Sequence, residues 1–177
     1  MNKHKRAWIL LTGIVLATMF LFFIIGEKDL NDQTMTGYLT VIKERDNGTI
    51  HNVYVSAKNS KEIVGKYTIN EQTKLVNVNC DSIAHESFKV GQVVEMTNNG
   101  LVLTSIPFAT TALKMVLKEE NEAEAKATRK AIQQTYDLSE VAFSIEEVKQ
   151  NQQTGQWKVV FNSLSGQDKE VIVSIDQ

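Results

Sequence analysis

The sequence has little cysteine, proline or histidine: one, one and three residues among 177. One cysteine cannot form a disulfide within the chain, so stability must come from ordinary packing. The single proline and nine glycines exclude low-complexity character. A zinc site needs three or four ligands in a recognisable spacing. His51, Cys80 and His85 do not provide one, and we expect neither a metal nor another cofactor.

Signatures of common enzyme and nucleic-acid-binding classes are also missing. There is no glycine-rich phosphate loop and no serine nucleophile elbow. Beyond residue 26 the chain has all 21 acidic residues but only 16 of the 19 basic ones, a net charge of −5. A phosphate-tracking surface would need a basic stripe, so we expect no nucleic acid partner. Glu140, Glu146 and Glu147 could supply a glycosidase carboxylate pair, but at strand positions they are better interpreted as a solvated face.

What the sequence does have is one long apolar run near its start. Ala7 to Ile25 contains no charged residue and follows three positive charges at Lys3, Lys5 and Arg6. A helix of this length, at about 1.5 Å per residue, spans roughly the 30 Å core of a bilayer. We therefore predict an uncleaved transmembrane signal anchor over residues 1–26. Signal cleavage after Ala17 is the alternative, but it would leave eight mostly apolar residues at the new N-terminus.

The charges beside this run predict its orientation. Positive residues are retained on the cytoplasmic side, so the N-terminus is expected inside the cell and everything after Glu27 outside. The chain would be a single-pass protein of the cell membrane. Residues 27–36 have no apolar period and are expected to form a short stalk.

Residues 37–117 show short apolar runs separated by turn residues. Asp46-Asn47-Gly48 is a strong hairpin signal, because Asn and Gly tolerate positive φ. Asn47-Gly48-Thr49 also matches a glycosylation sequon, for which the hairpin is the better explanation. The spacing favours a small closed barrel or a sandwich. The expected strands are Tyr38–Ile42, Thr49–Val55, Ile63–Ile69, Lys74–Val78, Gly91–Met96, Leu101–Thr104 and Ala112–Leu117.

Residues 118–177 change pattern, which makes the chain an α+β protein. Asn121–Tyr136 is rich in good helix formers and predicts one helix with a narrow apolar stripe. Three alternating segments follow and predict an antiparallel sheet, so the unit is α-β-β-β. At about 60 residues it is marginal alone and should dock on the barrel or on a partner. The stripe is Ala125, Thr128, Ile132 and Tyr136, and the segments centre on Phe143, Val159 and Val173.

Two resemblances follow from particular residues. Gly37, the run 88–94, Asn99-Gly100-Leu101 and the run 104–109 resemble the YobA-like family of exported Gram-positive proteins. That resemblance implies an OB-like barrel over residues 37–117 and no known activity. The helix with the strands at 157–161 and 171–176 looks like a PepSY-type unit over residues 118–177. Such units are implicated in inhibiting peptidases or in sensing in the cell envelope. Neither family supplies a catalytic residue.

Two groups of residues are candidate sites. Cys80 and His85 lie close in sequence, and a thiol nucleophile needs a base within hydrogen-bond reach. A loop with a small buried thiol is the simpler interpretation. Tyr38, Tyr54 and Tyr67 lie on three expected strands and would form a ligand-stacking face if they shared one side of the barrel.

Three functional hypotheses remain open. The leading one is a non-catalytic, membrane-anchored binding or regulatory protein of the bacterial cell envelope, with an envelope protein as partner and no identified small-molecule ligand. The second is a thiol-dependent hydrolase centred on Cys80 and His85. The third is a passive assembly subunit whose alanine-rich helix docks on a partner.

Overall fold

The computed structural model describes residues 32–58, 60, 63–119, 121–135, 143–163 and 168–175. The predicted anchor over residues 1–26 and the first five residues of the predicted stalk lie outside this described part. Within it, no helix has the length and apolar character needed to cross a membrane. Residues 32–177 belong to a single compact unit, so the two expected modules are not separate bodies.

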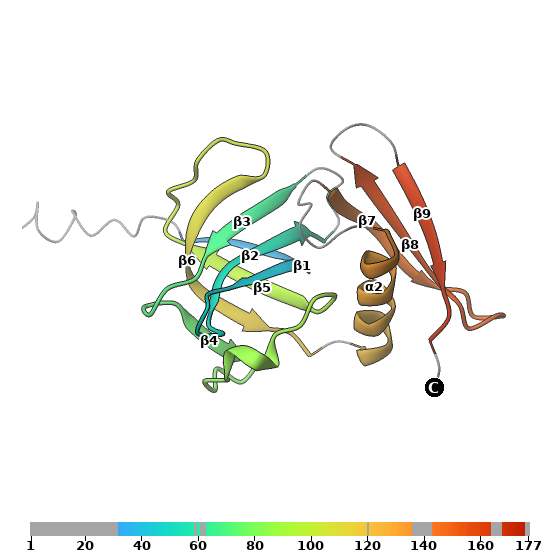
Figure 1. The fold of residues 1–177 in the computed structure, drawn as a ribbon, viewed down its shortest axis with the longest axis horizontal. Helices are drawn as coiled ribbons and strands as arrows, with labels where there is room; N and C mark the ends of the chain where they lie inside the picture. Colours follow the sequence, from blue (N-terminus) through green and yellow to red (C-terminus); the bar gives the residue numbers. More distant parts are fainter. Residues whose placement is uncertain are drawn as a thin grey trace, which may run out of the picture. The chain divides into compact units, whose positions relative to one another are not determined.

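Five strands close into a small mixed β-barrel (Figure 1). Strand β1 pairs antiparallel with both β2 and β5, and β5 pairs antiparallel with β6. The ring closes where β3 runs parallel to β6. A further short strand, β4, pairs with the second half of β6, beyond β3. The bounds are β1 (Gln33–Glu44), β2 (Ile50–Ala57), β3 (Val64–Thr68), β4 (Lys74–Asn77), β5 (Val93–Asn98) and β6 (Phe108–Leu117).

Alternating side chains fill the barrel, as the period of two along a strand requires. Leu39 and Val94 point inward and are fully buried, whereas their neighbours Tyr38 and Val93 point to the outer face. The ring of Tyr67 is fully buried inside the barrel and meets Phe108 edge-on, with centroids 5.7 Å apart. The interior is therefore a packed core.

The predicted hairpin between β1 and β2 is confirmed. The N–H of Gly48 donates to the carbonyl of Arg45, and the N–H of Arg45 donates to that of Thr49. Gly48 has a φ of +78°, the conformation that the sequence signal anticipated.

Two boundaries differ from the sequence prediction. Strand β1 begins at Gln33, so the last four residues of the expected stalk are strand, paired with β5. The strand expected at Leu101–Thr104 is wrong, because only Leu103 forms an isolated bridge, to Ala109. The first part of β6 has β3 along one edge, while β5 pairs only from Ala112 onward. Residues 101–104 thus have one short edge to pair with and form a loop.

The C-terminal part is one helix on a three-stranded antiparallel sheet of order β7-β8-β9, as predicted. Its elements are α2 (Glu122–Thr135), β7 (Phe143–Gln150), β8 (Trp157–Ser163) and β9 (Asp168–Val173). Thr128 and Ile132 of the expected stripe are buried, Ala125 is half-buried, and Tyr136 lies outside the described residues. Ala127 and Ala131 are the other fully buried residues of the helix.

The helix and sheet pack against the outer face of the barrel at β1, β2 and β5. Tyr38 and Val93 belong to the same buried cluster as the helix and the sheet residues Phe143 and Trp157. The hydroxyl of buried Ser56, on β2, accepts a hydrogen bond of 2.7 Å from the N–H of Ile145, on β7. The C-terminal unit therefore docks on the barrel, one of the two arrangements expected for so small a unit.

Candidate functional site

The predicted thiol site is a surface turn. Cys80 is exposed, which contradicts the expectation of a small buried thiol. It lies in a short loop after β4 and has a φ of +66°, with its N–H donating to the carbonyl of Asn77. The side-chain oxygen of Asn77 accepts from the N–H groups of Asn79 and Asp81, which stabilises this turn. A residue with positive φ is common at the end of a three-residue hairpin loop.

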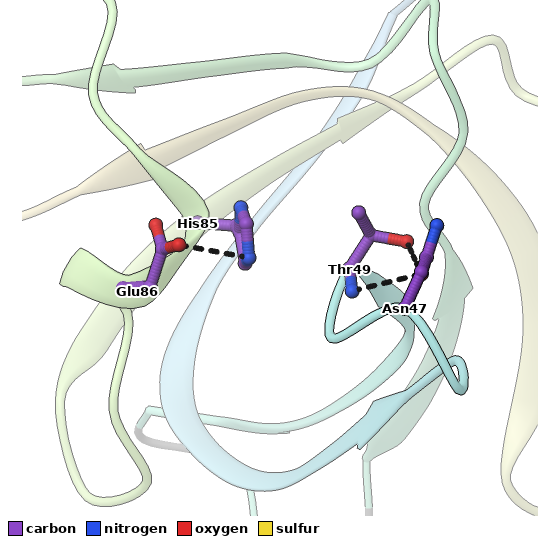
Figure 2. Close-up of polar contacts among 4 residues, drawn as sticks. All are labelled: Asn47, Thr49, His85 and Glu86. Atoms are coloured by element: carbon purple, nitrogen blue, oxygen red, sulfur yellow. Dashed lines mark hydrogen bonds and ion pairs between the residues drawn. The ribbon is translucent and has the colours of Figure 1, made fainter.

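His85 does not pair with that cysteine. Figure 2 shows its imidazole facing Glu86, with Nε2 3.2 Å from Oε1. Among the described residues, no hydrogen bond joins His85 to the thiol of Cys80. The geometry does not bring a nucleophile and its base together, and a thiol-dependent hydrolase stays a prediction without structural support.

The sequon residues have a structural role in the turn. Figure 2 shows Asn47 and Thr49 in contact: the Asn47 side-chain oxygen accepts from the hydroxyl of Thr49 at 2.7 Å and from its N–H at 3.1 Å. Such an Asx turn stabilises the hairpin locally.

The three tyrosines lie in three different environments, each less than 10% exposed. Tyr38 lies under the C-terminal helix and donates to Glu124 at 2.7 Å. The Tyr54 ring has the Lys43 and Lys66 ammonium groups 5.7 and 6.0 Å from its centroid. Tyr67 lies inside the barrel. They do not share an exposed face, and a ligand contact at these rings stays a prediction.

Of the remaining carboxylates of interest, Glu147 takes part in a surface ion pair. Glu147 lies 3.1 Å from the ammonium of Lys158, which also lies 3.5 Å from Glu170. These contacts raise the pKa of Lys158, chiefly through its hydrogen bond to Glu147. Glu146 is half-buried on β7, and Glu140 lies outside the described residues. No group of three or more metal-ligating side chains gathers in the part of the chain that the structure describes.

A cleft of about 320 Å³ lies where α2 meets the barrel. The close approach of α2 that forms this cleft depends on Gly91, which lies just before β5. Gly91 has a φ of +90°. A Cβ on this residue would lie 2.4 Å from the carbonyl oxygen of Ala125 and 2.7 Å from the nitrogen of Arg129. The helix approaches the barrel this closely only because residue 91 has no side chain. Arg129 fixes the contact by donating from Nε to the carbonyl of Val90 at 2.8 Å.

The wall of this cleft is predominantly cationic. Four basic side chains line it: Lys89, Lys118, Lys126 and Arg129. The other lining residues are Gln92, Val93, Glu122 and Ala125. Lys118 lies 3.3 Å from Glu95, and Lys126 lies 3.0 Å from Glu122. Four cations thus line the cleft with one carboxylate, Glu122, while Glu95 pairs with Lys118 from outside the lining, on a chain whose overall charge is −2. Such an excess of positive charge in a hollow favours an anionic group.

The charges in the cleft influence one another. The hydrogen bond and charge of Lys126 lower the pKa of Glu122, and the charge of Lys89 lowers it further. Glu122 therefore remains ionised to a lower pH than an isolated glutamate. Lys89 itself is exposed at the mouth of the cleft.

Comparison of the sequence with models of known protein families gives no match, and comparison with curated proteins gives none either. No family is assigned on this basis. The fold and the cleft are therefore what supports a functional proposal.

Sequence reasoning missed this cleft. Its cations come from the loop before β5, the residue after β6 and the helix, so no local motif marks it. The only signal was Gly91, at the start of an expected strand. The spacing of Lys126 and Arg129 along a helix shows that they share a face, but not what that face meets.

Proposed function

We propose that this chain is a membrane-anchored, extracytoplasmic binding or regulatory protein of the bacterial cell envelope, with no catalytic activity of its own. The apolar run of residues 7–25, preceded by three basic residues, supports the anchor and its orientation. A protein partner in the envelope belongs to the same proposal.

The fold supports two finer assignments. A five-stranded ring closed by the parallel pair β3 and β6 is the arrangement expected of an OB-type barrel, in line with the YobA-like resemblance of residues 37–117. The helix followed by three antiparallel strands fits the PepSY-like resemblance of residues 118–177. Both assignments concern the fold, and fold alone does not determine function.

The cationic cleft is the observation that supports a binding role most directly. It combines a defined hollow, an excess of positive charge and an Arg129 side chain positioned by the backbone of Val90. Arg and Lys recognise phosphate and carboxylate groups through charge-assisted hydrogen bonds. The ligand we propose is therefore an anionic group, presented by a small molecule or by the partner.

The apolar face of α2 is less suited to partner binding. Ala127, Ala131 and Ile132 are fully buried within the chain's own core. The hypothesis of a passive subunit that docks through this face would require the helix to leave the sheet, and nothing in the fold favours it.

Binding of inorganic phosphate and citrate to the full chain in detergent micelles tests the proposal. Calorimetric titration should show binding of one of these anions that weakens as salt is added. Substituting both Lys89→Ala and Lys126→Ala should reduce the affinity about tenfold or more, because two of four cations are lost. Lys169→Ala removes an exposed cation on β9, outside the cleft, and should leave the affinity unchanged. Binding that is equally sensitive to Lys169→Ala, or absent for both anions, would contradict an anion site in the cleft.

A further inference from the structure

The loop between β5 and β6, residues 99–107, carries exposed apolar side chains. We refer to it as the apolar loop. Leu101, Leu103 and Ile106 are 67%, 71% and 80% exposed. They are the three most exposed large apolar side chains in the described part of the chain. Figure 1 shows this loop arching out from the barrel on the side away from α2. Scattered apolar residues on a surface are common, but three on one projecting loop form a patch that indicates an interaction.

The backbone of the apolar loop is held in this position. Leu103 and Ala109 exchange backbone hydrogen bonds of 2.8 and 3.3 Å. The hydroxyl of Thr110 donates to the carbonyl of Leu101 at 2.6 Å. The hydroxyl of Ser105 donates to the carbonyl of Pro107, also at 2.6 Å. These contacts hold the loop's backbone in place while Leu101, Leu103 and Ile106 remain largely exposed.

The surrounding sequence has no charge. Between Glu95 and Lys114 there is no Asp, Glu, Lys or Arg. A protein-binding loop tolerates charged residues at its rim. A loop that enters a lipid surface does not, because charged side chains are expensive in the apolar region of the bilayer.

The apolar loop also begins beside the point where the described chain starts. Gln33, the first residue of β1, pairs with Asn98, the last residue of β5. The apolar run ends at Ile25, so residues 26–32 alone separate it from Gln33. Seven residues reach at most about 25 Å when fully extended. In an anchored chain, Gln33 therefore lies no more than about 25 Å from the end of the apolar run, and the apolar loop begins next to Gln33.

We propose that the apolar loop inserts Leu101, Leu103 and Ile106 into the outer leaflet of the membrane that anchors the chain. This inference rests on the proposed function, since it requires the anchor. The barrel would then contact the membrane at two points, the start of β1 and the apolar loop. Two contacts fix its orientation, with the loop toward the lipid.

Site-directed spin labelling of the full chain in vesicles of phosphatidylethanolamine and phosphatidylglycerol tests this. The background is Cys80→Asn, because Asn tolerates the positive φ of residue 80. Single labels are placed through Leu101→Cys or Ile106→Cys, and through Ile172→Cys as the matched control. Ile172 is a 59% exposed aliphatic residue on β9, in the C-terminal sheet. Collision with oxygen reports an apolar environment, and collision with a nickel chelate reports water.

The labels at residues 101 and 106 should show an oxygen-to-nickel accessibility ratio several-fold higher than the label at residue 172. A ratio equal to that of residue 172, in chains that float with the vesicles, overturns the insertion and leaves the anchor intact. Labels shielded from both reagents also overturn it, since they would lie against a second copy or another protein. Chains that do not float with the vesicles would contradict the anchor, and with it both the proposed function and this inference.

Discussion

At the scale of single residues, Gly91 combines two constraints that are separable by experiment. Its φ of +90° is unfavourable for any residue with a side chain, and α2 leaves no room for a Cβ. Gly155, in the turn between β7 and β8, has a φ of +70°, but no atom lies within 4 Å of the point that its Cβ would occupy. The two glycines therefore differ mainly in the packing against them.

We predict that Gly91→Ala lowers the free energy of unfolding by about 3 kcal/mol or more, because strain and overpacking add. Gly155→Ala should cost only about 1 kcal/mol, from its conformation alone. Urea denaturation of the full chain in micelles measures the free energy of unfolding of both variants. Unfolding is followed through the fluorescence of buried Trp157, in a Trp8→Phe background. Equal losses for the two variants would show that α2 does not pack on Gly91.

Two buried tyrosine hydroxyls provide a second comparison. Tyr67 is fully buried, and its hydroxyl has no hydrogen-bond partner among the described residues. Burial raises the pKa of this phenol well above its usual value. Tyr38 has nearly the same burial, but its hydroxyl donates to Glu124 at 2.7 Å.

We predict that Tyr67→Phe is neutral or stabilises the chain by up to about 1 kcal/mol, because it removes an unpaired buried hydroxyl. Tyr38→Phe should destabilise it by roughly 1–2 kcal/mol, since a hydrogen bond to a carboxylate is lost. The same denaturation experiment compares them. A loss for Tyr67→Phe as large as that for Tyr38→Phe would mean that the Tyr67 hydroxyl has a partner after all.

At the scale of elements, a buried hydrogen bond between β2 and β7 connects the C-terminal sheet to the barrel. The hydroxyl of Ser56 satisfies the N–H of Ile145 at a position where both residues are buried. An unpaired backbone N–H in such a place costs about 1–3 kcal/mol.

Ser56→Ala should therefore destabilise the chain by about 2 kcal/mol and accelerate amide hydrogen exchange at Ile145. Ser105→Ala is the control, because it removes a hydroxyl from an exposed hydrogen bond in the apolar loop and should cost less than about 0.5 kcal/mol. Unchanged exchange at Ile145 in Ser56→Ala would indicate that the two elements are not joined there.

The elements also show what local sequence can and cannot predict. The alternation at Phe143–Ile145 and at Trp157–Phe161, and the Asn47-Gly48 turn, determine local structure directly, and each was predicted correctly. Leu101–Thr104 has strand composition but only one short edge of β6 to pair with, which no local pattern reveals. The burial of Ala127 and Ala131 was missed because alanine is compatible with either face of a helix.

At the scale of the whole molecule, the barrel and the C-terminal unit have one shared core in addition to the barrel's own. The sequence indicated two modules and their approximate bounds. It did not indicate that Tyr38 and Val93, on the outer face of the barrel, complete the core of the second module. For the same reason it could not predict the cationic cleft, which exists only where the two modules meet.

The proposed function requires the described part of the chain to lie outside the cell, and Cys80 tests this directly. It is the only cysteine, and it is exposed on a surface turn. A membrane-impermeant maleimide should label it equally in intact and in lysed cells that make the chain. A variant with Cys80→Asn and Asn2→Cys places the thiol in the N-terminal tail and should react only after lysis. If Cys80 reacts only after lysis while residue 2 is labelled in intact cells, the orientation is reversed and the proposed function is contradicted.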